Sequence, residues 1–189
     1  MRIQSVDILG LCEIENRKVV NDLIYYTPLS KIPYKIIHQQ SPDYRGIDVA
    51  LVYNADKFKA INQKFHPVHF SFDTTLTTRE ILETTLVSVG NDTLHIFVNH
   101  WPSRWGGELK SRPKRIAASL ALSNAINSVL QKNNNANIIV MGDFNDSPTD
   151  QSIKDTLIGK TYPFSNPVCQ LVNLSETKNK HIGTHKYKG

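Results

Sequence analysis

The stretch Val140-Met-Gly-Asp-Phe-Asn-Asp-Ser-Pro148 decides how the rest of the chain is interpreted. An apolar run, residues 138–141, ends at Gly142 and is followed at once by Asp143 and Asn145. Because the side chains of a strand alternate between its two faces, positions 143 and 145 point the same way. A buried strand that carries a carboxylate and an amide at its carboxyl end is typical of functional sites in α/β folds. The alternative interpretation is a strand closed by an Asx turn, where Asp and Asn are common because they hydrogen-bond locally.

The length and composition of the chain are those of a globular domain. It has 189 residues, of which 40% are hydrophobic and 21% charged, so we expect residues 1–189 to form a single domain with its own core. No apolar run approaches the ~20 residues that a membrane span requires. The first residues resemble the start of a strand rather than a signal peptide. This leaves the compartment of the protein open, and the two cysteines, Cys12 and Cys169, do not decide it.

The net charge of +5 favours anionic partners such as nucleic acid, phosphoesters or acidic membranes. Five basic residues lie between positions 104 and 115, with Trp101 and Trp105 close by; they are Arg104, Lys110, Arg112, Lys114 and Arg115. Arginines beside aromatic rings suit phosphate contact and base stacking, so Arg104, Arg112, Arg115 and Trp101 are candidate substrate-binding residues. The alternative is a solvated basic helix start with tryptophan packed inward.

The apolar patterns predict strands with helices between some of them. Strands are expected at residues 6–12, 34–38, 47–53, 58–70, 80–89, 93–99 and 138–142, with a weaker one at 169–174. Helices are expected from Asn16 until Pro28, from Ser111 until Asn133, and near 150–157. Ser111 is expected to cap the long helix, with Pro113 in its first turn. This order of elements predicts a layered α/β sandwich with mixed sheets.

Three of the predicted strands end in polar residues that could carry chemistry. These are Glu13, then Asn99 with His100, then Asp143 with Asn145. If the strands lie side by side, their ends meet in one cleft. Carboxylate and amide oxygens suit a hard cation such as Mg²⁺, and imidazole beside it suits proton transfer. Taken singly, Glu13 could cap the helix after it and His100 could order a loop; the coincidence of all three strand ends favours a site.

Four motifs in the same order resemble the endonuclease/exonuclease/phosphatase family of metal-dependent phosphoesterases. They are Asp7-Ile-Leu-Gly-Leu-Cys-Glu-Ile-Glu15, Tyr44-Arg-Gly-Ile-Asp-Val-Ala-Leu-Val-Tyr53, Asn99-His-Trp-Pro-Ser103 and Gly142-Asp-Phe-Asn145. The resemblance spans nearly the whole chain. It implies a four-layered α/β sandwich, in which two stacked mixed β-sheets are flanked by helices.

The resemblance also implies a role for each candidate residue. Glu13 corresponds to the metal-binding Glu, with Mg²⁺ as the expected ion and Mn²⁺ as an alternative. His100 is placed as the active-site histidine, Asp143 as the residue that positions or activates the attacking water, and Asn145 as a ligand of phosphate or metal. Arg79 resembles the family arginine that faces the scissile phosphate, although it could equally be a surface residue.

Two parts of the family pattern are missing from the sequence. No strand with a metal-proximal Asn precedes Val6, and no closing Asp-His pair precedes Gly189, since neither His181 nor His185 follows an Asp. Thr184-His-Lys-Tyr187 resembles the segment just before that pair. We therefore expect an internal fragment of a longer enzyme, with a fold that is incomplete at both ends and little activity by itself.

These features leave three functional hypotheses. The leading one is a Mg²⁺-dependent, nuclease-like phosphodiesterase that acts on DNA or RNA. The second keeps the same chemistry on a phosphomonoester, an inositol phosphate or a phospholipid. The third is a non-catalytic remnant that binds an anion or a partner. The oligomeric state is not indicated by the sequence.

Overall fold

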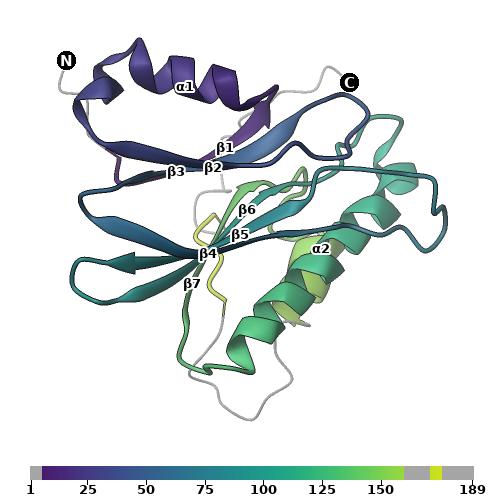
Figure 1. Cartoon of the computed structure of the whole chain (residues 1–189). Coiled ribbons are helices and arrows are strands. Elements are labelled where there is room, and N and C mark those ends of the chain that lie inside the picture. The colour runs from purple at the N-terminus through teal and green to yellow at the C-terminus, as the bar shows by residue number, and fades with distance from the viewer. Residues whose placement is uncertain (1–5, 160–170, 176–189) are drawn as a thin grey trace.

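Two stacked β-sheets form the centre of the molecule, and helices cover their outer faces (Figure 1). The computed structural model describes residues 6–159 and 171–175. The first sheet has the order β1-β3-β2 and is antiparallel in both pairings; its strands are β1 (Ile8–Ile14), β2 (Tyr34–His38) and β3 (Asp48–Asn54). The second sheet has the order β4-β5-β6-β7, with strands β4 (Phe58–His66), β5 (Ile81–Ser88), β6 (Thr93–His100) and β7 (Asn137–Asp143).

The second sheet is mixed, because β6 and β7 run parallel while its other pairings are antiparallel. The β5–β6 hairpin turns at residues 89–92, with Asn91 at φ 66°, and joins strands that the sequence predicts at 80–89 and 93–99. Layers of helix, sheet, sheet and helix follow one another (Figure 1). The predicted α/β sandwich of two stacked sheets flanked by helices is therefore confirmed.

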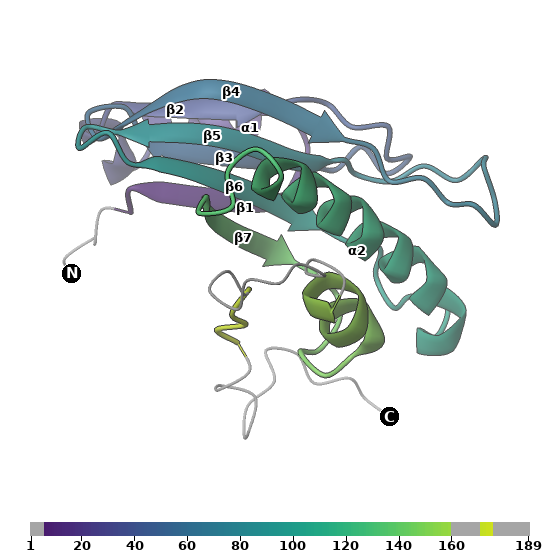
Figure 2. The ribbon, with the colours of Figure 1, turned by 90° about the horizontal axis from the view of Figure 1, so that it is seen from below.

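Helix α1 (Arg17–Tyr25) covers the first sheet, and α2 (Glu108–Leu130) covers the second. The Asn16 side chain caps α1 by accepting a hydrogen bond from the Val19 N–H at 3.1 Å. A 3-10 turn, η1 (Pro28–Lys31), follows where Pro28 was expected to stop the helix. A short helix, η2 (Ser152–Ile158), packs beside α2 (Figure 2). Within the described residues, no helix has the length and apolar character needed to cross a membrane.

Alternation along the strands of the second sheet builds a core on each of its faces. Leu82 and Leu86 of β5 and Ile96 of β6 point toward the first sheet and meet Leu51 of β3. Alternate residues of the sheet point the other way, toward α2, and include Ile81 and Phe97. They form a second cluster with Trp101 and with Leu122 and Ile126 of α2. Every residue of β3 is buried, because β3 lies in the middle of its sheet and both faces are covered. Burial of such apolar surface stabilises a domain by about 25 cal/mol per Å², so the stacking of these layers is what fixes the strand ends in space.

Three local predictions need correction. The long helix begins at Glu108 with Gly107 as its N-cap, not at Ser111. Gly106 and Gly107 have φ values of 83° and 107°, so the chain turns there and can enter the helix earlier. The Ser111 hydroxyl instead donates to the Gly107 carbonyl at 2.7 Å, inside the first turns. The short helix predicted near 150–157 exists but winds as a π-helix. Residues 171–173 have no regular structure and 174–175 form a turn, so the described part of the predicted strand at 169–174 is not a strand; Cys169 lies outside the described residues.

Gly142, at the end of β7, sits where no other residue fits. Its φ is 130°, and a Cβ built there would lie 1.9 Å from the carbonyl oxygen of Asn99. Asn99 is the residue of β6 that pairs with Gly142. The close approach of β7 to the end of β6 therefore depends on the absence of a side chain at position 142.

We expect Gly142→Ala to lower the free energy of unfolding by about 3 kcal/mol or more, through strain and collision with Asn99. Gly106→Ala is the matched control, because Gly106 also has a positive φ but a Cβ there would meet nothing within 4 Å. The control should cost only about 1–2 kcal/mol, from the backbone conformation alone. Urea denaturation of the two variants measures the difference. Equal losses would show that the contact with Asn99 does not constrain β7.

Candidate functional site

The carboxyl ends of β6 and β7 bring His100 and Asp143 together. In the parallel pairing of these strands, Asn99 is opposite Gly142 and His100 is opposite Asp143. The first sheet stacks on the same place, since the Cys12 thiol of β1 donates to the Asn99 carbonyl at 3.3 Å. The carboxylates of Glu13 and Asp143 both act electrostatically on the His100 imidazole. The three polar strand ends named in the sequence thus lie at one site.

Glu13 reaches this site through a β-bulge. The pairing of β1 with β3 shifts by one residue between Leu11, opposite Ala50, and Ile14, opposite Asp48. Within the bulge Glu13 has a φ of 59°, a conformation that costs a non-glycine residue about 1–3 kcal/mol. Its side chain is exposed. Bulges commonly re-aim a side chain next to a site, and here the bulge places a solvent-accessible carboxylate near His100.

His100 is buried and neutral at physiological pH. The whole residue is only 5% exposed. Burial and the Arg79 guanidinium lower the pKa of His100 to about 4, although the carboxylates of Asp143 and Glu13 act in the opposite direction. Its Nδ1 is buried and has no hydrogen-bond partner among the residues the structure describes. A neutral imidazole with an unpartnered nitrogen is suited to exchange a hydrogen bond with a bound ligand.

Asp143 and Asn145 are joined by the turn that offered the alternative interpretation of this stretch. The Asp143 Oδ1 accepts the Asn145 backbone N–H at 2.8 Å, so the Asx turn and the polar strand end coexist. Asn145 has a φ of 51° and donates from Nδ2 to the Trp101 carbonyl at 2.9 Å. In return the Trp101 N–H donates to the Asp143 carbonyl at 2.9 Å. The segments that follow β6 and β7 are thereby locked to each other.

Arg79 supports the same segment from inside the protein. Its Nε donates to the His100 carbonyl at 3.1 Å and its Nη2 to the Trp101 carbonyl at 2.8 Å. Its Nη1 pairs with Asp43 Oδ2 at 2.8 Å, and the Arg79 side chain is 2% exposed. Burial alone would raise the pKa of Asp43, but hydrogen bonds from Arg45 and Arg79 lower it below its ordinary value. Arg79 therefore holds the backbone on which His100 sits and has no side-chain surface left to meet a substrate.

Arg104 and Arg115 hold the loop that follows Asn145. The Arg104 Nε donates to the Asn145 carbonyl at 3.0 Å, and its Nη2 contacts Asp150 at 2.5 Å and Asp146 at 3.0 Å. Arg115 is completely buried, with Nε 2.7 Å from Asp146 Oδ1. Of these two predicted substrate contacts, Arg115 lacks exposed surface and Arg104 is largely occupied by acidic partners.

The two tryptophans have opposite surroundings. Trp101 is 1% exposed, donates from Nε1 to Asn99 Oδ1 at 3.2 Å, and meets Phe144 edge to face at 4.9 Å. Trp101 is thus a core residue in this structure rather than an open stacking surface. Trp105 is 89% exposed. The Arg112 side chain is 39% exposed and pairs with Glu108 at 3.1 Å.

Sequence reasoning missed the acidic residues that neutralise the buried arginines. Asp43 and Asp146 were not among the candidates, yet each binds a guanidinium inside the protein. The signal available in the sequence was indirect: Asp146 directly follows Asn145, Asp150 lies four residues further on, and a basic cluster that becomes buried needs counterions.

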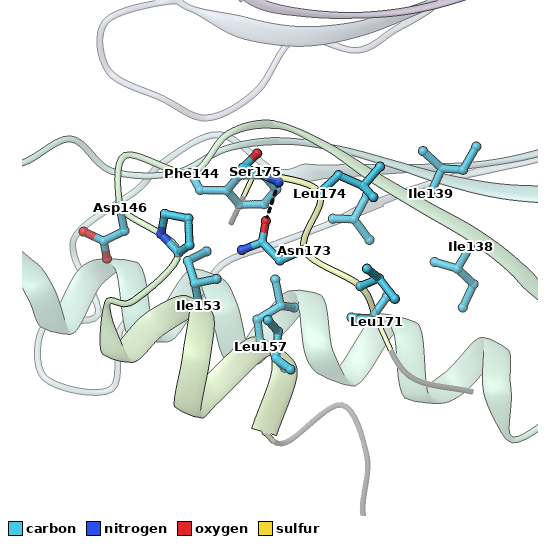
Figure 3. Close-up of a pocket in the computed structure, with 14 residues that line it drawn as sticks. Ile138, Ile139, Phe144, Asp146, Ile153, Leu157, Leu171, Asn173, Leu174 and Ser175 are labelled. Atoms are coloured by element: carbon cyan, nitrogen blue, oxygen red, sulfur yellow. Dashed lines mark hydrogen bonds between the residues drawn. The ribbon is translucent and has the colours of Figure 1, made fainter. Parts of the chain in front are cut away.

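A separate apolar groove lies between β7, η2 and residues 171–175 (Figure 3). Ile138, Ile139, Leu157 and Leu174 are among its lining residues. The Asn173 side chain accepts a hydrogen bond from the Ser175 N–H at 3.0 Å at its edge. None of Glu13, His100 and Asp143 lines the groove. The polar cluster at the strand ends is therefore the better candidate for chemistry.

A divalent ion fits this polar cluster only if water supplies most of its ligands. Among the described residues, no group of three or more His, Cys, Asp or Glu side chains is arranged to hold a metal. The exposed carboxylates of Glu13 and Asp143, both near His100, supply hard oxygen ligands. Mg²⁺ usually keeps several waters and takes few carboxylates, so these two residues suit it.

Comparison with known proteins gave one family and several solved structures. The family model described as Endonuclease/Exonuclease/phosphatase family matches residues 2–189. No curated protein matches the chain.

The similar solved structures include the human Nocturnin catalytic domain with bound sulfate, at 23% identity and a TM-score of 0.61, covering 79% of this chain and 55% of that one. Truncated TDP2 of Caenorhabditis elegans has 19% identity and a TM-score of 0.57, with 78% and 52% covered. The mannosyl-6-phosphatase of Bacteroides thetaiotaomicron has 18% identity and a TM-score of 0.61, with 82% and 56% covered. The chain spans about half the length of these structures. At such identities the likeness shows a shared fold.

The lowered pKa of His100 predicts a loss of stability in mild acid. Its pKa is about 4 when folded and ~6.5 when unfolded, so between these values the unfolded chain binds more protons. Its contribution is therefore present above pH ~6.5 and is lost as the pH falls toward 4. From pH 7 to pH 5 we expect the free energy of unfolding to drop by about 2 kcal/mol on account of this residue. Urea denaturation at both pH values, compared with His100→Asn, isolates the effect, and the same drop in the variant would contradict it.

Proposed function

Because this chain belongs to the endonuclease/exonuclease/phosphatase family, we propose that it takes part in metal-dependent hydrolysis of a phosphodiester in nucleic acid. The observation that carries the proposal is the pairing of His100 with Asp143 at the end of the β6–β7 ladder, with the Glu13 carboxylate close by. A buried neutral imidazole, an exposed carboxylate pair and a fixed amide at one site are the groups that phosphoester hydrolysis needs.

Glu13 is proposed to hold the metal ion, with Mg²⁺ expected and Mn²⁺ as an alternative. When bound, such an ion supplies Lewis-acid stabilisation of charge that develops on the phosphoryl oxygens. The exposure of the Glu13 carboxylate and the preference of Mg²⁺ for oxygen ligands support this assignment.

The other residues act on water and on the phosphate. Asp143 is proposed to orient the attacking water and to take up its proton, since its Oδ1 is already fixed by the Asn145 N–H. His100 donates a hydrogen bond to a non-bridging phosphate oxygen, as a neutral imidazole. Asn145 is positioned by its bond to the Trp101 carbonyl and keeps a second N–H on Nδ2 for the phosphate. Arg79, Arg104 and Arg115 are positioning residues for these segments.

The charge of the protein favours nucleic acid over smaller substrates. The net charge is +5, and the exposed Trp105 and the partly exposed Arg112 lie on the segment that follows His100. Such a surface suits a charged backbone with bases that can stack. The family alternatives, a phosphomonoester, an inositol phosphate or a phospholipid, would use the same polar cluster. A substrate panel of plasmid DNA, single-stranded DNA and RNA, sugar phosphates, inositol phosphates and sphingomyelin separates them.

We expect Asp143→Asn to slow hydrolysis ~10²–10⁴-fold, the usual contribution of one catalytic group. The substitution keeps an oxygen acceptor for the Asn145 N–H, so the turn should survive and the loss should fall on chemistry. Asp92→Asn is the matched control, because Asp92 is exposed in the β5–β6 turn at the opposite end of the sheet. Turnover is measured with Mg²⁺, with Mn²⁺ and with EDTA, and EDTA should abolish it.

The prediction that this chain turns over slowly by itself is tested in the same assay, with long incubations and high enzyme concentration. Glu13 is the carboxylate proposed for the metal among the described residues, and a single carboxylate ligand supports weak metal affinity. Turnover that Asp143→Asn does not change would contradict the proposed mechanism. Binding of anions without any hydrolysis would favour the non-catalytic alternative.

A further inference from the structure

The arginine expected to face the phosphate is unavailable in this structure. All three nitrogens of the Arg79 guanidinium have partners: the carbonyls of His100 and Trp101, and the carboxylate of Asp43. Its side chain is 2% exposed. To bind a substrate, Arg79 would have to leave its buried ion pair with Asp43, which would leave an uncompensated charge inside the protein.

A second arginine is attached to the same carboxylate from the outside. Asp43 Oδ1 accepts the backbone N–H of Arg45 at 3.0 Å and the Nε of Arg45 at 3.3 Å, while its Oδ2 binds Arg79. The loop is closed by a bond from the Gly46 N–H to the Asp43 carbonyl at 2.9 Å, with Gly46 at φ 64°. Asp43 thereby links a buried guanidinium, which supports His100, to an outer one.

The outer guanidinium keeps its binding edge free. Nε of Arg45 is held by Asp43, but no partner for its Nη1 or Nη2 occurs among the described residues. Its side chain is 38% exposed. Because a guanidinium binds phosphate best through two parallel N–H bonds from a pre-oriented fork, an arginine fixed at Nε and open at Nη is well prepared for an anion.

A chain of contacts connects this guanidinium to the candidate site: Arg45 binds Asp43, Asp43 binds Arg79, and Arg79 donates to the His100 carbonyl. The charge of Arg45 acts on the His100 imidazole and contributes to the lowering of its pKa, after the larger effects of burial and Arg79. It acts on Arg79 as well. An anion bound beside the His100 end of β6 would therefore lie within the field of Arg45.

We propose that Arg45, rather than Arg79, is the guanidinium that binds the substrate phosphate, with Asp43 holding it in place beside His100. The proposal rests on the proposed function for its substrate class, but the anion site itself can be tested without turnover.

The test measures binding of inorganic phosphate to the 189-residue chain by isothermal titration, for the wild type, Arg45→Gln and Arg45→Lys. Loss of a charge-assisted hydrogen bond typically costs about 1.5–3 kcal/mol, so Arg45→Gln should raise the Kd at least ~10-fold. Arg45→Lys should recover only part of the affinity, because lysine keeps the charge but lacks the fork. Lys57→Gln is the control of equal charge change: Lys57 is paired with Asp7 at 2.8 Å, beyond the opposite end of β3.

Guanidinium ¹⁵N signals in the same titration distinguish the two arginines. Signals of Arg45 should shift with phosphate while those of Arg79 stay nearly unchanged. Phosphate affinity that is unaltered in Arg45→Gln, equally weakened in Lys57→Gln, or absent in the wild type would overturn the proposal. If Arg45→Gln weakens phosphate binding but Asp143→Asn leaves hydrolysis unchanged, the anion site stands and the proposed mechanism fails. If Asp143→Asn slows hydrolysis but Arg45→Gln leaves phosphate binding unchanged, the mechanism stands and the anion site fails.

Discussion

Parallel backbone pairing between β6 and β7 carries His100 and Asp143 to the same edge of the second sheet. The ladder runs in register from Leu94 opposite Asn137 to His100 opposite Asp143. Parallel strands need a long connection, and α2 supplies it while burying one face of the sheet (Figure 2). The register of the ladder thus determines which two side chains meet, and a slip by one residue would turn each of them to the other face.

The first sheet adds its contribution through close stacking. A Cβ at Gly10 of β1 would come within 2.7 Å of the Met141 side chain of β7, and the Cys12 thiol reaches the Asn99 carbonyl. With the sheets this close, the bulge at Glu13 is what turns a carboxylate toward the ends of β6 and β7. The strained backbone at Glu13 occurs at the candidate site, as stored strain often does. Gly142, where an added Cβ would collide with Asn99, lies at the same site.

The need to neutralise buried charge explains why some arginines have a structural role while others stay at the surface. Arg79 and Arg115 are taken out of water and each is matched by an aspartate, Asp43 or Asp146. A buried pair adds little net stability compared with an apolar pair, but losing one partner is costly. The pairs are therefore better understood as geometric constraints: each fixes a segment that carries His100 or Asn145.

The sequence predicted the strand ends well because an apolar run that stops at a polar residue is a local signal. Glu13, His100 and Asp143 were found in this way, and the fold class followed from the order of the elements. The burial of Trp101, Arg79 and Arg115 could not be predicted from such a local signal, because it depends on which surfaces α2 and the second sheet cover. The early start of α2 at Glu108 depended on the positive φ values of two glycines, and the bulge at Glu13 on its pairing with β3; neither leaves a periodic pattern.

The most direct test of a shared site at these strand ends is paramagnetic broadening of backbone amide signals by substoichiometric Mn²⁺. The signals of Glu13, His100 and Asp143 should broaden first, although these residues belong to three different strands, and Glu13→Gln should remove most of the effect. Broadening centred on other carboxylates, or unchanged by Glu13→Gln, would contradict the assignment of these residues to one metal-binding site.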